Sequence, residues 1–487
     1  MKLVIIGLGT AGFAAALTAR KTDMTSSITI IDSKGFDLLH PCGLPFYLEG
    51  KIKKLSDLKH DLGLKQMNIE KVKDKAVNID TKNKIVETER NKKIGYGKLI
   101  IATGASPLMP PIKGKEMAYT LHNSEDAEKI KEIKEKKVTI VGASAIGLET
   151  AVALNKNGKD VTVIDMLPSA FPRAIDPDIS KVLEEYLEKK GIKLLFNEKI
   201  SKIDKNQAVI LAAGVKANKE IAEKAGIKCS KSGIIVNDKL ETSAKDVYAA
   251  GDCIETKSFI TKKPFMAQIA AAAYRQGVIA AANALAGNEK YDGALATFVS
   301  VIDEIEVAAT GFNTSFAGSN GYKVDNIEGA GWFSGVKILT ANGRIIGAHG
   351  IGKEISGRIN VLSAAIKAGM GVEELKAIDF ITEDKTVSVG EKGRITQRLK
   401  GSTKPDWFPG GKEITVELYA DSSGKLTGAK LEGEEGTAWR ANVLLTAIKA
   451  GFTLKDLSNL ELAYCPSVSQ HYDVLVMAAD LELRKLK

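Results

Sequence analysis

A lone cysteine and two glycine-rich turns are the features of this chain best suited to chemistry. Cys42 stands in the run His40-Pro41-Cys42-Gly43-Leu44-Pro45-Phe46, and none of the four cysteines (Cys42, Cys229, Cys253 and Cys465) forms a C-x-x-C pair. This spacing predicts neither a metal site nor a local dithiol, so a redox cysteine must act singly or with a distant partner. Pro45 suits the first turn of a helix, whose free N–H groups would stabilise a Cys42 thiolate. A protonated His40 would lower the pKa of that thiol further.

The first glycine turn opens the chain. An apolar strand over residues 3–6 precedes Gly7-Leu8-Gly9-Thr10-Ala11-Gly12, a helix over 13–20 follows, and a strand over 28–31 ends in Asp32. This order is typical of a dinucleotide-binding βαβ unit. Gly7 permits the tight turn, Gly9 lets the backbone approach a pyrophosphate, and Gly12 lets helix and strand pack closely. The helix N-terminus holds phosphate, and Asp32 accepts hydrogen bonds from ribose hydroxyls.

A second glycine turn repeats the pattern. A strand over 138–141 precedes Gly142-Ala143-Ser144-Ala145-Ile146-Gly147, a helix follows over 148–155, and a strand over 161–164 ends in Asp165. Ser144 replaces the middle glycine, so close approach of a phosphate is expected to be strained there. Asp165 would accept from a free 2′-hydroxyl and repel a 2′-phosphate, and the next arginine is Arg173. This site therefore favours NADH over NADPH.

With two further motifs, the chain resembles the pyridine nucleotide–disulfide oxidoreductase superfamily. The run 99–105 resembles its return strand and turn, and the run 246–252 resembles its second FAD motif, whose last Asp bonds the ribityl chain. The resemblance implies FAD and NAD(P)H as cofactors. Expected FAD contacts are Gly7, Gly9, Thr10, Ala11, Gly12, Asp32, Ala102, Thr103, Gly104, Gly251 and Asp252. Expected nicotinamide-cofactor contacts are Gly142, Ser144, Ile146, Gly147, Glu149 and Asp165.

The resemblance also implies the domain plan of an α/β protein. Residues 1–113 and 237–290 are expected to form a Rossmann-like FAD-binding domain, and residues 114–236 a Rossmann-like nicotinamide domain. The family's antiparallel meander is cut short, because residues 192–203 lead almost at once into 209–211. Residues 291–400 and 401–487 are expected to be two copies of an α+β interface domain.

The Cys42 segment narrows the resemblance to the single-cysteine branch. Its C-G-L-P run is similar to that of coenzyme A-disulfide reductases, NADH oxidases and polysulfide reductases. This implies an NAD(P)H-dependent enzyme that reduces coenzyme A disulfide, another small disulfide or a polysulfide at Cys42. Two alternatives stay open: an oxygen- or peroxide-reducing NADH oxidase, and a non-catalytic flavin redox sensor that binds a partner. Relatives usually carry Ser and His where this chain has Leu38 and Thr10, and Thr10 argues against the oxidase.

The C-terminal part contains an internal repeat. The run 343–348 corresponds to 424–429, 360–369 corresponds to 442–451, and Gly331-Trp332-Phe333 echoes Asp406-Trp407-Phe408. These similarities predict a local duplication. In the resembling family this domain forms a homodimer, and tyrosines near the C-terminus reach the partner's active site. Tyr464 is the expected proton or hydrogen-bond donor, whereas Phe408 cannot fill the second tyrosine role. If the segment of Tyr464 approaches the flavin of the other subunit, Cys465 is a candidate resolving thiol for Cys42.

The composition limits which partners and which cellular location are expected. The chain of 487 residues is 44% hydrophobic and 26% charged, which is ordinary for a globular protein of about three domains. The net charge of +9 comes mostly from scattered lysines without an aromatic-basic motif, so nucleic acid is not expected. No apolar run is long enough for a membrane span, and the N-terminus has no signal-peptide layout. A cytoplasmic protein with a small-molecule disulfide substrate is expected.

Overall fold

The computed structural model describes residues 1–485, without the side chains of residues 395, 396, 484 and 485. The N-terminal domain is built on a parallel five-stranded sheet in the order β17-β9-β1-β2-β5. Its strands are β1 (Lys2–Ile6), β2 (Ser27–Ile31), β5 (Ile69–Val72), β9 (Lys98–Ile101) and β17 (Val247–Ala249). The central strands are runs of Val, Leu and Ile buried on both faces, as expected of a covered parallel sheet.

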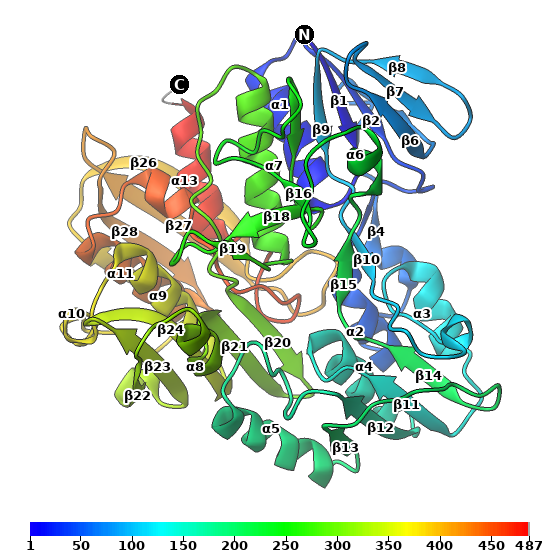
Figure 1. The fold of residues 1–487 in the computed structure, drawn as a ribbon. Helices are drawn as coiled ribbons and strands as arrows, with labels where there is room; N and C mark the ends of the chain where they lie inside the picture. Colours follow the sequence, from blue (N-terminus) through cyan, green and yellow to red (C-terminus); the bar gives the residue numbers. More distant parts are fainter. Residues whose placement is uncertain (486–487) are drawn as a thin grey trace.

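Helices α1 (Thr10–Thr22) and α7 (Ala270–Ala284) lie side by side on this sheet (Figure 1). Both helices are rich in alanine, and a Cβ on Gly277 would lie 2.2 Å from the Ala11 carbonyl oxygen. Small side chains therefore let the two backbones approach closely. An antiparallel ribbon of β6 (Ala76–Asp80), β7 (Ile85–Thr88) and β8 (Lys93–Gly95) extends the domain.

The nicotinamide domain has a parallel sheet in the order β13-β12-β11-β14. Its strands are β11 (Lys137–Val141), β12 (Asp160–Asp165), β13 (Lys193–Phe196) and β14 (Ala208–Leu211), and its helices are α3 (Ser124–Lys131), α4 (Ala145–Lys156) and α5 (Pro177–Lys189). Residues 197–207, which the structure describes, contain no strand and only an isolated bridge from Lys202 to Lys113. The meander is thus short, as the sequence predicts.

Residues 215–236 lie with the FAD side and not with the nicotinamide sheet. Strand β15 (Val215–Ala217) pairs with β10 (Ala105–Pro107), and β16 (Ile234–Ile235) pairs with β18 (Ile254–Lys257), which also pairs with β19 (Pro264–Phe265). The domain boundary expected at residue 236 is therefore too late, because the chain leaves the nicotinamide sheet directly after β14.

Two antiparallel sheets form the C-terminal part (Figure 1, left). We call residues 291–386 the first C-terminal unit and residues 387–485 the second. The first unit contains β20 (Phe298–Ile302), β21 (Ile305–Gly311), α8 (Thr314–Ser319), β22 (Asp325–Glu328), β23 (Val336–Ala341), β24 (Arg344–Gly352), α9 (Ile355–Ala368) and α10 (Val372–Lys376). The second contains β25 (Val387–Gly390), β26 (Arg394–Ser402), β27 (Glu413–Ala420), β28 (Leu426–Gly433), α11 (Thr437–Lys449), α12 (Leu454–Ser458) and α13 (Val474–Lys485). The boundary expected at 400/401 falls inside β26 and is corrected by this pairing.

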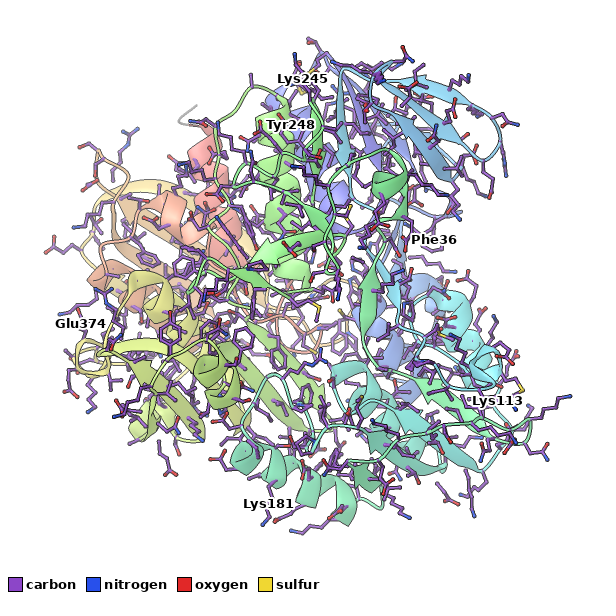
Figure 2. All side chains as sticks on the ribbon, in the orientation of Figure 1. Phe36, Lys113, Lys181, Lys245, Tyr248 and Glu374 are labelled. Carbon is purple, nitrogen blue, oxygen red and sulfur yellow. The ribbon has the colours of Figure 1, made fainter. Side chains whose placement is uncertain are left out.

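The short elements that remain are β3 (Leu38–Leu39), β4 (Lys59–His60), α2 (Leu44–Glu49) and α6 (Glu220–Lys224). Exposed lysines occur on several domains: Lys181 lies on α5, while Lys113 and Lys245 lie in loops (Figure 2). Among residues 1–485, no helix combines the length and apolar character that a membrane span requires. The α/β fold with two Rossmann-like domains and an α+β C-terminal part is confirmed.

Candidate active site

The first glycine turn has the geometry of a phosphate cradle. Gly7 has a φ of +99°, and a Cβ there would lie 2.3 Å from the Ala102 carbonyl oxygen. A Cβ on Gly12 would lie 2.1 Å from the Gly7 oxygen, whereas no atom lies within 4 Å of a Cβ on Gly9. The backbone is thus packed tightly on the protein side and open at Gly9, where the N-terminus of α1 can receive a pyrophosphate. The residues present fit FAD at this turn.

Asp32 is fixed by the turn itself. Its Oδ2 accepts hydrogen bonds from Leu8 N at 2.7 Å and from Lys34 Nζ at 2.7 Å. Its Oδ1 accepts from Lys34 N at 2.9 Å. The carboxylate is therefore held beside the glycine turn by backbone groups from both ends of the βαβ unit.

The second glycine turn repeats these contacts almost atom for atom. Gly142 has a φ of +117°, and Ala143 N donates to Asp165 Oδ2 at 2.8 Å, as Leu8 N does to Asp32. A Cβ on Gly147 would lie 2.0 Å from the Gly142 oxygen. Ser144 caps α4 with φ −107° and ψ −171°, close to the −97° and −165° of Gly9 in the first turn. Serine adopts this backbone conformation freely, and the expectation that a phosphate approaches less closely at Ser144 stays a prediction.

The second FAD motif ends in Asp252, whose carboxyl accepts no hydrogen bond from the described residues. Gly251 N donates to Gln276 Oε1 at 2.8 Å, and the partly exposed Asp252 follows. In the described part of the chain, no group donates to the carboxylate oxygens of Asp252, and burial raises its pKa to about 6. An acceptor poised without a donor fits a ribityl hydroxyl. Thr103 is used differently, because its hydroxyl donates to the Asn218 carbonyl at 2.6 Å.

The Cys42 segment forms a single 3-10 turn, Pro41–Gly43, which leads into α2. The Cys42 side chain is exposed, yet desolvation by the surrounding protein raises the pKa of its thiol to about 12, and the Glu149 and Asp252 charges act in the same direction. Burial also lowers the pKa of His40 to about 3, so this imidazole is neutral. Both shifts oppose the thiolate, stabilised by a helix and a protonated His40, that the sequence predicts.

Aromatic side chains of the second C-terminal unit cover this segment. The Trp407 indole stacks on the His40 imidazole with centroids 4.8 Å apart, and the Phe408 and Phe46 rings meet edge to face at 5.0 Å. A Cβ on Gly43 would lie 3.0 Å from the Trp407 ring. Only a small residue therefore fits directly after Cys42. The contact of Trp407 with His40 cannot be predicted from the sequence, because no local pattern encodes it.

Tyr464 also lies in the neighbourhood of Cys42 of the same chain. Burial raises the pKa of its hydroxyl well above the usual value, and the Cys42 and Cys465 thiolate charges raise it further. Its ring meets His471 edge to face at 5.7 Å. The hydroxyl therefore keeps its proton and can donate it. The resemblance places this tyrosine at a partner's active site, whereas here it lies near Cys42 of its own chain.

Glu149 joins the nicotinamide domain to the first C-terminal unit. Its Oε1 accepts from the Ser300 hydroxyl at 2.6 Å, and burial raises the pKa of its carboxyl to about 7. Glu149 is partly exposed and close enough to Cys42 to affect its pKa. A carboxyl in this position exchanges its proton near neutral pH.

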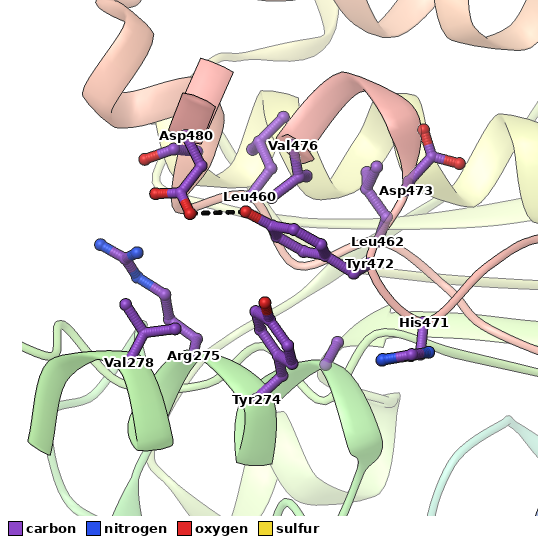
Figure 3. Close-up of a pocket in the computed structure, with 12 residues that line it drawn as sticks. Tyr274, Arg275, Val278, Leu460, Leu462, His471, Tyr472, Asp473, Val476 and Asp480 are labelled. Atoms are coloured by element: carbon purple, nitrogen blue, oxygen red, sulfur yellow. Dashed lines mark hydrogen bonds between the residues drawn. The ribbon is translucent and has the colours of Figure 1, made fainter. Parts of the chain in front are cut away.

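A pocket lies between α7 and the C-terminal segment of the second unit (Figure 3). The Tyr274 and Tyr472 rings stack at 4.5 Å, and the Tyr472 hydroxyl donates to Asp480 at 2.5 Å. His471 links the pocket to Tyr464, because it also meets Tyr274 edge to face at 5.8 Å. No local sequence pattern indicates this pocket. The described residues contain no cluster of His, Cys, Asp and Glu able to hold a metal ion.

Comparison with known proteins agrees with this geometry. Residues 1–277 match the family described as pyridine nucleotide-disulphide oxidoreductase. The chain is 32% identical to a Methanocaldococcus jannaschii protein named NADH oxidase, over 100% of this chain and 99% of that protein. It is 28% identical to a Pyrococcus furiosus protein named NAD(P)H sulfur oxidoreductase (CoA-dependent), over 98% of each. A solved NAD-dependent persulfide reductase from A. fulgidus shares 26% identity at a TM-score of 0.66, over 100% of this chain and 84% of that one. This chain belongs to the pyridine nucleotide-disulphide oxidoreductase family.

Proposed function

We propose that this FAD- and NAD(P)H-dependent enzyme reduces a small disulfide, coenzyme A disulfide or a polysulfide, through Cys42. The observation that carries the proposal is the position of Cys42. It is exposed, it lies near Asp252 of the FAD motif and Glu149 of the nicotinamide domain, and the buried Tyr464 hydroxyl, which keeps its proton, lies in its neighbourhood. Relatives named as sulfur and persulfide reductases support the same chemistry. A cytoplasmic location stays a prediction.

Two groups of residues are proposed to hold the cofactors. FAD would contact Gly7, Gly9, Thr10, Ala11, Gly12, Asp32, Ala102, Thr103, Gly104, Gly251 and Asp252. The nicotinamide cofactor would contact Gly142, Ser144, Ile146, Gly147, Glu149 and Asp165. When bound, FAD supplies the two-electron relay by which NAD(P)H and one proton reduce RSSR to two RSH and NAD(P)⁺.

The protein's own groups handle the sulfur and the protons. The Cys42 sulfur, once deprotonated, attacks one sulfur of the disulfide, so that one S–S bond forms, one breaks and RS⁻ leaves. The Tyr464 hydroxyl would give its hydrogen bond or proton to the departing sulfur. His40 is neutral and stacked, so its role is to hold the Cys42 segment in place.

NADH is proposed as the preferred reductant. Both oxygens of Asp165 accept backbone hydrogen bonds, from Ala143 N at 2.8 Å and Leu167 N at 2.9 Å. A carboxylate fixed in this way at the end of β12 favours a 2′-hydroxyl and repels a 2′-phosphate.

Oxygen reduction is the second candidate, favoured by the relative named NADH oxidase. One experiment separates the two. Anaerobic NADH oxidation is measured with coenzyme A disulfide, polysulfide or no acceptor, and then with oxygen. The Cys42→Ser variant should lose sulfur-dependent turnover by more than about 100-fold, while Cys229→Ser, which alters a remote and partly buried thiol, should match the wild type. Full sulfur-dependent turnover in Cys42→Ser would refute the proposal.

A further inference from the structure

The two C-terminal units share one topology. Strands β21-β24-β23-β22 of the first sheet follow the same order as β25-β28-β27-β26 of the second, and only β20 is extra. In each unit a long helix follows the last strand of the sheet in chain order and packs on that sheet. Helix α9 follows β24, and helix α11 follows β28. The four shared strands and the helix pairs α9/α11 and α10/α12 therefore correspond in order, whereas α8 and α13 have no counterpart.

Local details pair individual residues of the two units. Ile345 N donates to the Met370 carbonyl at 2.9 Å, and Leu426 N donates to the Phe452 carbonyl at 2.8 Å. Gly311 has a φ of +70° and Gly390 a φ of +66°. A Cβ on Gly311 would clash with the Ile346 carbonyl oxygen, and a Cβ on Gly390 would clash with the Thr427 carbonyl oxygen. Ile346 and Thr427 occupy equivalent positions in the two units. Shared backbone irregularities of this kind define which residues are equivalent, and make Asn360 the equivalent of Asn442.

The contacts between the units are reciprocal. Asn360 Oδ1 accepts from Ala463 N at 2.7 Å, and Asn442 Oδ1 accepts from Ile381 N at 2.8 Å. Ala463 and Ile381 are themselves equivalent, because each lies 21 residues after the asparagine of its own unit. The asparagine of each unit thus accepts a backbone hydrogen bond from the other unit. This exchange is the mark of an isologous, twofold contact.

The twofold relation has an axis through two touching helices. Gly357 of α9 and Trp439 of α11 occupy equivalent positions, and a Cβ on Gly357 would lie 2.6 Å from the Trp439 Cβ. A residue that contacts its own equivalent lies on the axis of the pair. Val361 and Val443, the next equivalent pair along the same helices, are both fully buried. The surface through which two copies of such a unit would associate is therefore already buried between the two units of one chain.

The two units differ at the redox site. Trp407 and Phe408 of the second unit cover His40 and Phe46, whereas Trp332 of the first unit stacks on Phe380 of its own unit at 5.0 Å. The position equivalent to Tyr464 is Thr382 in the first unit. Of the two units, only the second thus contributes aromatic side chains that cover the Cys42 segment.

The second unit also contacts the FAD-binding domain around the pocket of Figure 3. Tyr472 and Asp480 of the second unit line it together with Tyr274 and Arg275 of α7. The guanidinium Nε of Arg275 is buried without a hydrogen-bond partner among the described residues, and the stacked tyrosines lie beside it. Contact with α7 and with the Cys42 segment fixes the second unit at two places on the same domain.

We propose that the second C-terminal unit is a built-in partner. It occupies the place that a second copy of the chain would hold against the first unit, and it completes the Cys42 site in cis. A single chain is then the catalytic unit, in contrast to the homodimer that the sequence resemblance implies. Because the two units are covalently joined, their association is intramolecular, so site assembly does not depend on protein concentration.

The test uses two full-length chains with different affinity tags, expressed together. One carries Cys42→Ser and the other carries Trp407→Ala with Tyr464→Phe. Completion in cis predicts that purification on both tags in sequence recovers no mixed complex, and that NADH-dependent disulfide reduction equals the sum of the separate variants. A mixed complex whose turnover exceeds that sum by several-fold would overturn the proposal, because it would show one chain completing the site of another.

Two controls keep this test decisive. If the Trp407→Ala, Tyr464→Phe chain alone retains wild-type turnover, the second unit does not complete the site and the proposal fails; if that chain does not fold, Tyr464→Phe replaces it. Trp332→Ala, which removes the corresponding indole of the first unit, should leave turnover within about twofold. The proposal relies on the proposed function only for turnover. Recovery of a mixed complex can be measured without any activity. Light scattering of the flavin-loaded wild type also needs no activity, and it should give the mass of one chain, 52.1 kDa, at protein concentrations from about 1 to 100 μM.

Discussion

The indole of Trp407 lies on the imidazole of His40, with ring centroids 4.8 Å apart and an interplanar angle of 26°. Burial beneath this ring contributes to the low pKa of His40, which is about 3. Trp407→Ala should therefore hydrate the imidazole and raise its pKa toward 6.5. Histidine-selective NMR titration can follow this change, because the chain has only five histidines. Trp332→Ala is the matched control, and a His40 pKa that stays near 3 in Trp407→Ala would contradict the stacking geometry.

The protonation of Cys42 gives a second prediction. With a pKa of about 12, the thiol of the flavin-free protein is almost wholly protonated at pH 7 to 9. The rate of Cys42 alkylation by iodoacetamide should rise about tenfold per pH unit across this range, without levelling, because only the thiolate reacts. Peptide mass spectrometry after timed quenching measures this rate. A plateau between pH 7 and 9 would show that an interaction absent from our account lowers the pKa.

The FAD-side elements were predictable because their signals are local. Gly7, Gly12 and Asp32 act within one βαβ unit, and the contacts that require them lie within that unit or on the adjacent return strand. The second turn was predictable for the same reason, and the effect of Ser144 on the approach of a phosphate stays a prediction. The role of each of these residues in cofactor binding stays a prediction.

The surroundings of Cys42 were not predictable, because they depend on contacts between segments far apart in sequence. The motif correctly indicates a helix whose first turn contains Pro45, but the pKa of the Cys42 thiol depends on burial and on Glu149 and Asp252. Likewise, Trp407 reaches His40 only through the placement of a whole C-terminal unit. The repeat in the sequence indicates two similar units, yet it does not indicate that their asparagines would be exchanged.

The raised pKa of Glu149 has a consequence for stability. A carboxyl whose pKa is about 7 in the folded state and 4.5 when unfolded favours folding at low pH, and this contribution is lost as the pH rises through 7. Glu149→Gln keeps an acceptor for Ser300 but has no charge to desolvate. In flavin-free protein it should therefore stabilise the fold at pH 8.5, by at most about 3 kcal/mol, and change little at pH 5.

Thermal unfolding of wild type and Glu149→Gln at the two pH values tests this difference. Glu198→Gln, at an exposed site of the same domain, serves as a control for charge removal alone. An equal effect of Glu149→Gln at pH 5 and pH 8.5 would mean that the carboxyl does not titrate between them.

The contrast between Gly9 and Gly12 separates cofactor binding from folding. A Cβ on Gly9 would meet no atom within 4 Å, whereas one on Gly12 would lie 2.1 Å from the Gly7 oxygen. Gly9→Ala should therefore leave the melting temperature of the flavin-free protein within about 1 °C, yet weaken FAD binding at least about tenfold, or about 1.4 kcal/mol, because the methyl group points into the space left for the pyrophosphate. Gly12→Ala should destabilise the flavin-free protein itself, by about 1–3 kcal/mol. Flavin fluorescence titration and thermal unfolding measure the two effects. FAD affinity unchanged in Gly9→Ala would show that the pyrophosphate does not lie at this turn, since the open space beside Gly9 would then serve no ligand.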